Sequence, residues 1–109
     1  MKRKGIVLVT FDAPATPGFL EWAHGKHMED CGKAPGVREV RRYHVVEGPP
    51  DRRTNLSITE YDDLDAALEY RQSEAARLIK ADANAQGVDN RYTLACREIF
   101  SITFRDTVD

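Results

Sequence analysis

Residues 5–11, which read GIVLVTF, decide the fold that this sequence predicts. Successive side chains of a strand face opposite sides of a sheet, and here both sets of positions are apolar or β-branched. Because a strand of this kind is covered on both faces, we expect residues 5–11 to lie at the centre of a sheet. The loop over residues 12–16 then interrupts the extended chain.

A first helix is predicted over residues 17–31. Thr16 is its expected N-cap, with Pro17 in the first helical turn and Gly32 as the stop. The apolar and amphipathic side chains along this helix are those of Phe19, Leu20, Trp22, Ala23, His27 and Cys31. A second strand follows over residues 37–46, and its charged residues fall on both faces, as at a sheet edge or in the wall of a polar cavity.

The second half of the chain repeats this alternation of strand and helix. After a loop rich in proline, residues 56–61 are predicted to form a third strand. Asp62 is the expected N-cap of a second helix that ends near Ala85. Ser73 could instead cap a separate helix after a kink or break near Arg71, and the sequence leaves these two possibilities open.

A fourth strand is predicted over residues 91–104, where large apolar side chains recur at every second position. The order β-α-β-β-α-β is that of the ferredoxin-like fold, an α+β domain with a four-stranded antiparallel sheet. The helices would cover one face of the sheet and leave the other for a second copy, so we expect a homodimer. We expect residues 1–109 to form one such domain.

The charge balance argues against several classes of function. The 109 residues contain 16 Lys and Arg against 18 Asp and Glu, a formal net charge of −2, so a surface that neutralises nucleic-acid phosphates is not expected. After the positive start, only residues 6–9 are continuously apolar, which is too short for a signal peptide. No run approaches the ~20 apolar residues of a membrane helix. We therefore expect a cytoplasmic protein that binds neither membrane nor nucleic acid.

Several short motifs resemble a known family. They are Phe19-Leu20-Glu21-Trp22, then His27 with Pro35-Gly36-Val37 eight residues later, Arg42-Tyr43, Glu60-Tyr61 and Ser73-Glu74-Ala75. Together they resemble the EthD-like dimeric α/β-barrel proteins over most of the chain. That superfamily includes polyketide cyclases, quinone-forming monooxygenases, muconolactone isomerases, haem-degrading enzymes and proteins of unknown role, so the fold alone selects no reaction. Ala23 departs from the pattern, because relatives often carry a second aromatic residue there.

The resemblance implies a pocket between the helices and the sheet, with histidine and tyrosine around a substrate. His27 is the candidate catalytic acid/base, since an imidazole titrates near neutral pH. Tyr43 and Tyr61 are candidates for orienting or polarising the substrate, and Trp22 and Phe19 for apolar contact with it. Each also has an ordinary structural role open to it. His27 could be solvated or bonded to a carbonyl, and the tyrosines and Trp22 could simply pack in the core.

We expect neither a metal nor another cofactor. His24, His27 and Cys31 share one stripe of the predicted first helix, but a single helix supplies three metal ligands awkwardly. Cys31 and Cys96 have no C-x-x-C spacing and are expected to be free thiols. Five arginines are interspersed with acidic residues and are interpreted as a solvated strand edge; they are Arg38, Arg41, Arg42, Arg52 and Arg53.

Two functions remain open at this point. The first is a cofactor-independent enzyme that acts on a small carbonyl-rich or aromatic molecule by proton transfer, isomerisation, cyclisation or oxygenation. The second is a non-catalytic binding or stress-related protein that uses the same pocket.

Overall fold

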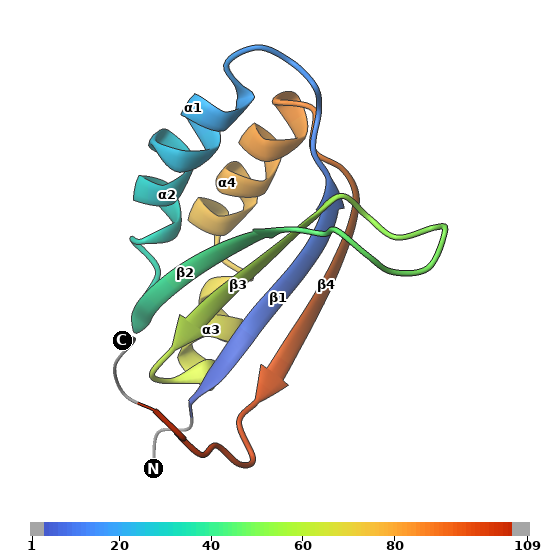
Figure 1. Cartoon of the computed structure of the whole chain (residues 1–109). Coiled ribbons are helices and arrows are strands. Elements are labelled where there is room, and N and C mark those ends of the chain that lie inside the picture. Colours follow the sequence, from blue (N-terminus) through green and yellow to red (C-terminus); the bar gives the residue numbers. More distant parts are fainter. Residues whose placement is uncertain (1–3, 106–109) are drawn as a thin grey trace.

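The computed structural model describes residues 4–105, which contain one four-stranded sheet. Its strands are β1 (Gly5–Asp12), β2 (Val37–His44), β3 (Asn55–Tyr61) and β4 (Asp89–Arg97). They lie in the order β2-β3-β1-β4, and every neighbouring pair is antiparallel (Figure 1). The predicted central position of β1 and the predicted α+β, ferredoxin-like fold are therefore confirmed.

The first predicted helix is two short helices, α1 (Phe19–His24) and α2 (Lys26–Cys31). The prediction of one helix over residues 17–31 with Thr16 as N-cap was wrong, because Gly18 occupies the N-cap position. The break lies at Gly25, whose φ of −107° and ψ of −98° are not helical. A Cβ at this position would lie 2.9 Å from the carbonyl oxygen of Glu21, so the chain passes here only because the residue is glycine.

The second predicted helix is also divided, into α3 (Leu64–Tyr70) and α4 (Glu74–Ala85). Ser73 caps α4, since its hydroxyl accepts a 3.2 Å hydrogen bond from the amide of Ala76. The break near Arg71 that the sequence left open is therefore present. Asp63 caps α3 in place of the predicted Asp62, whose amide is bonded to the Gly36 carbonyl at 2.8 Å. None of the helices in residues 4–105 has the length and apolar character required to cross a bilayer.

The four helices in the described part of the chain all cover one face of the sheet (Figure 1). The core lies between them and the inward-facing residues of β1, in two clusters. One cluster is centred on Val7, Tyr61 and Leu64, and the other on Phe11 and Phe19. Residues of both clusters, among them Val7 and Phe11, also line a space under α2 and α4.

Within residues 4–105, no helix covers the opposite face of the sheet (Figure 1). Leu8 pairs in register with Ile58 on β3 and with Leu94 on β4, so an apolar row crosses three strands. Leu94 is 44% exposed in the single chain. Apolar surface of this kind is typical of an interface.

The predicted fourth strand ends earlier than expected. The prediction that it runs to Phe104 was wrong, because β4 ends at Arg97. The register explains the difference, since Arg97 pairs with Gly5, the first residue of β1, and a longer β4 would run beyond the strand that pairs with it. The large apolar residues that follow are exposed; they are Ile99, Phe100, Ile102 and Phe104.

Candidate functional site

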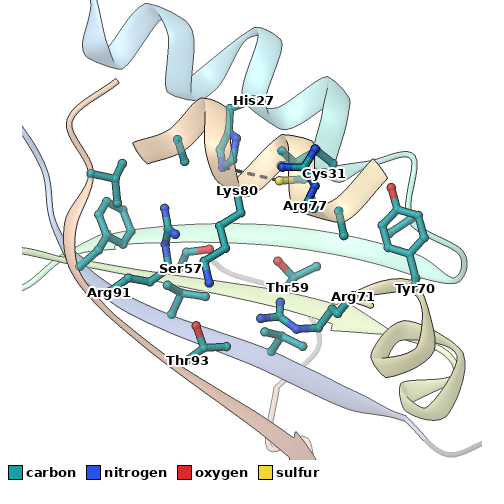
Figure 2. Close-up of a pocket in the computed structure, with 18 of the residues that line it drawn as sticks. His27, Cys31, Ser57, Thr59, Tyr70, Arg71, Arg77, Lys80, Arg91 and Thr93 are labelled. Carbon is teal, nitrogen blue, oxygen red and sulfur yellow. Dashed lines mark hydrogen bonds between the residues drawn. The ribbon is translucent and has the colours of Figure 1, made fainter. Parts of the chain in front are cut away.

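A cavity of about 460 Å³ lies between the helices and the sheet. Its floor is formed by β1, β3 and β4, with Ser57, Thr59 and Thr93 among the side chains that face it (Figure 2). His27 and Cys31 reach it from α2, and Arg77 and Lys80 from α4. The cavity thus has a mixed lining, which suits a small organic ligand that needs apolar contact and a few polar contacts.

His27 is the half-buried imidazole on the helix side of this cavity. Its ring stacks on the indole of Trp22, with centroids 4.6 Å apart and an interplanar angle of 23°. Its Nε2 lies 3.6 Å from the Sγ of Cys31, which is one helical turn further along (Figure 2). Its Nδ1 is buried and has no hydrogen-bond partner within residues 4–105. Such an unsatisfied group costs about 1–3 kcal/mol.

The surroundings of His27 favour its neutral form. Burial lowers the pKa of His27 below its ordinary value, and the positive charge of Arg42 lowers this pKa further. Burial also raises the pKa of the neighbouring Cys31 thiol. At neutral pH the pair is therefore an imidazole and a thiol, so His27 is able to accept a proton.

An ionic cluster next to the cavity holds Trp22 in place. The indole Nε1 of Trp22 donates to Asp82 on α4 at 3.2 Å. Lys26 donates to the same carboxylate at 3.0 Å and to Asp30 at 2.8 Å. These contacts join α1 and α2 to α4, so the ring on which His27 stacks has a fixed position.

The five residues predicted for the site do not all meet in this cavity. His27, Trp22 and Tyr61 line it, and burial raises the pKa of Tyr61 so that its hydroxyl stays protonated. Tyr43 is 46% exposed and is absent from the lining. Phe19 is buried in the core and lines a second, more open pocket at the loop after β1.

Several cations of the cavity were not among the predicted site residues. Arg42 was interpreted as part of a solvated edge, but it is half-buried and its guanidinium lies 5.3 Å from the centre of the Phe11 ring. Strand alternation separates it from Arg41 next to it, although alternation alone does not say which of the two faces the helices. The other cations in the lining are Arg71, Arg77, Lys80 and Arg91.

The described residues show no site for a metal ion. Within residues 4–105, no three side chains of His, Cys, Asp or Glu are grouped closely enough to hold one. His24 is exposed on α1, on the other side of the Gly25 break from His27 and Cys31.

Comparison with known proteins places this architecture among solved structures. No family model and no curated protein sequence matches the chain. An EthD family protein from Bacillus halodurans has a TM-score of 0.63 at 16% identity, and the match covers 88% of this chain and 99% of that one. SnoaB from Streptomyces nogalater has a TM-score of 0.64 at 10% identity, over 95% of this chain and 99% of its own.

A dimeric ferredoxin-like protein of unknown function from Thermobifida fusca is similar to the same extent. Its TM-score is 0.64 at 11% identity, over 87% of this chain and 91% of that chain. The chain shares the ferredoxin-like fold with these solved structures. The resemblance found in the sequence is thereby confirmed at the level of the fold. SnoaB is described as a cofactor-independent oxygenase and the Thermobifida fusca protein as one of unknown function, and identities of 10–16% transfer no activity to this chain.

Proposed function

We propose that this protein binds a small carbonyl-rich or aromatic molecule in the cavity under α2 and α4, and that His27 transfers a proton in a reaction that needs no cofactor. The observation that carries this proposal is the neutral, half-buried imidazole of His27 in the wall of a cavity of about 460 Å³. A base that is largely withdrawn from water and positioned next to a bound substrate contributes about 10² to 10⁴-fold to a rate.

The proposed step moves one proton and leaves no charge unbalanced. Nε2 of His27 takes a proton from a carbon next to a substrate carbonyl, after the thiol of Cys31 has moved aside. The electron pair of the broken C–H bond passes to the carbonyl oxygen, and the guanidinium of Arg42 stabilises the resulting enolate. The imidazolium then returns the proton to another atom of the substrate, which completes an isomerisation.

The other residues would hold the substrate. The protonated hydroxyl of Tyr61 is a donor for a substrate oxygen, and Trp22 supplies an aromatic face. Tyr43 and Phe19 do not line this cavity and have no part in the proposed step.

The proposed working form is a homodimer. The row formed by Leu8, Ile58 and Leu94 faces away from the helices, and a second sheet packed on this row would bury it. Two of the similar structures are described as dimeric, which supports the same assembly.

A proton-exchange assay tests the catalytic part of this proposal. Phenylpyruvate is a suitable probe because it combines an aromatic ring, a carbonyl group and an acidic C–H bond. In D₂O we expect the protein to accelerate deuterium incorporation next to the carbonyl, and His27→Gln to lose about 10² to 10⁴-fold of that rate. His24→Gln is the matched control, since His24 is exposed and does not line the cavity, and it should leave the rate unchanged.

One observation favours the second candidate function, binding without turnover. Neither ring nitrogen of His27 is open to a ligand in this structure, because Nδ1 is buried and Nε2 contacts the Sγ of Cys31. If phenylpyruvate binds, but its exchange rate is the same with the wild-type protein and with His27→Gln, the catalytic proposal fails and ligand binding alone remains.

A further inference from the structure

The cavity concentrates positive charge in a chain that is negative as a whole. The formal net charge of the protein is −2. Among residues 4–105, five cationic side chains line the cavity against one carboxylate, that of Glu74. Glu74 is already bonded through both of its oxygens to Arg77, so it is not available to neutralise the other four cations.

Arg42 is the first of these uncompensated cations. It stands on the edge strand β2, in register with Ser57 of β3, which is itself in register with Val9 of β1. Its guanidinium reaches over β3 as far as the ring of Phe11 on β1. It has no hydrogen bond or ion pair within residues 4–105. Its burial lowers its pKa, because partial burial of an unpaired charge is energetically unfavourable.

Arg91 approaches the same space from the opposite edge of the sheet. It lies on β4, is half-buried, and also has no hydrogen bond or ion pair in the described part of the chain. Burial lowers its pKa, and the nearby positive charge of Arg71 lowers it further. Tyr92, the next residue of β4, is in register with Thr10 of β1, so Arg91 lies beside Phe11, whose ring the Arg42 guanidinium approaches, and both arginines line the cavity.

Neither of these two half-buried guanidiniums is paired with a counter-charge within residues 4–105. We propose that a ligand supplies it, and that the ligand of this cavity is an aromatic carboxylate whose anionic group is bound by Arg42 and Arg91. This inference rests on the small-molecule site of the proposed function and adds the chemical class of the ligand. The fork of a guanidinium matches the two oxygens of a carboxylate, and such charge-assisted hydrogen bonds are about twice as strong as neutral ones.

The remainder of the lining fits the aromatic part of such a ligand. Val7, Val9 and Phe11 form an apolar stretch of the floor along β1, and Trp22 offers an aromatic face above it. Lys80 projects from α4 toward the sheet and adds a further positive charge (Figure 2). The site therefore combines an apolar surface for a planar ring with positive charge for its carboxylate.

A matched pair of probes tests this inference, namely 2-naphthoate and the neutral 2-naphthamide, which have nearly the same shape. Calorimetric titration of the wild-type protein should show 2-naphthoate bound at least 10-fold more tightly than 2-naphthamide. Arg42→Gln and Arg91→Gln should each weaken 2-naphthoate roughly 10- to 100-fold, since each removes a charged hydrogen bond. In both variants the affinity for 2-naphthamide should differ from that of the wild-type protein by less than about threefold.

The control is Arg38→Gln, which removes the same charge from the same strand outside the cavity. It should leave both affinities unchanged, and circular dichroism should show that all three variants are folded. Equal binding of both probes to the wild-type protein would overturn the inference and leave the proposed function intact. The inference would also be overturned if Arg42→Gln and Arg38→Gln weakened the binding of 2-naphthoate equally. Displacement of 2-naphthoate by inorganic phosphate at constant ionic strength would overturn it too. Binding of neither probe would overturn the small-molecule site itself.

Discussion

The imidazole of His27 and the indole of Trp22 are stacked, with their centroids 4.6 Å apart. Trp22 is the only tryptophan of the chain, so its fluorescence reports on this one environment. A protonated imidazole quenches the fluorescence of an indole on which it stacks. The fluorescence of Trp22 should therefore follow the protonation of His27.

The first prediction concerns the midpoint of that titration. Burial and the charges of Arg42 and Arg91 lower the pKa of His27, while Asp30 and Asp82 raise it more weakly than burial lowers it. We therefore expect fluorescence to fall on acidification with a midpoint below the ordinary histidine value of about 6.5. His27→Gln should abolish the transition. A midpoint above 6.5 would contradict the assigned environment.

The second prediction links the same group to stability. In the unfolded chain His27 has the ordinary histidine pKa of about 6.5, and in the folded protein its pKa is lower. At a pH between these two pKa values, the unfolded chain binds a proton at His27 that the folded protein does not bind. The free energy of unfolding should therefore fall as the pH falls through this window. Urea titrations at several pH values should show this slope in the wild-type protein and a smaller one in His27→Gln. A slope that is the same in the wild-type protein and in His27→Gln would contradict this prediction.

The third prediction concerns the start of β1. A Cβ at Gly5 would lie 2.6 Å from the backbone carbonyl of Cys96 on β4 and 2.8 Å from Cδ2 of Leu64. Gly5→Ala should reduce the free energy of unfolding by about 1–3 kcal/mol. Gly32→Ala is the comparison, because Gly32 has a φ of −68° and an added Cβ would meet nothing closer than 3.4 Å. It should be neutral or stabilise by about 0.4–1 kcal/mol. Equal effects in thermal or urea unfolding would count against the register of β1 on β4.

The fourth prediction concerns assembly. Leu94→Arg places a charge on the helix-free face of the sheet, and a twofold dimer would contain two such charges without partners. The dissociation constant of the dimer should rise roughly 100-fold or more in sedimentation equilibrium. Leu78→Arg, on the exposed surface of α4, should have no such effect. A wild-type protein that sediments at micromolar concentration as a folded monomer would contradict the dimer.

Local sequence patterns predicted a strand well where both of its faces are covered, or where turn residues lie at each end of the strand. The two-sided apolarity of residues 5–11 placed β1 at the centre of the sheet, as observed. The same kind of pattern failed at residues 98–104, because alternation in one segment does not reveal where its pairing strand begins. The helix break at Gly25 was missed for a similar reason. A single glycine is tolerated inside a helix, and only the close approach of the Glu21 carbonyl decides otherwise.

The side of the sheet that each residue of β2 faces could not be predicted from its own pattern. Charged residues occur at both parities, and a register irregularity between Val37 and Glu39 precedes the residues that matter. Arg42 therefore lines the cavity while Tyr43 does not, although the residues are adjacent. Arg91 was missed because it belongs to the other edge of the sheet, and only the folded chain brings it to the same space as Arg42.

We infer that the cavity under α2 and α4 is the ligand site and that His27 lies beside the ligand. A crystal structure of the protein with 2-naphthoate tests it most directly. We expect the naphthyl ring between Phe11 and Trp22, in contact with the imidazole of His27, and its carboxylate hydrogen-bonded to Arg42 and Arg91. A structure with His27 in bulk solvent, or with the probe bound only outside this cavity, would contradict it.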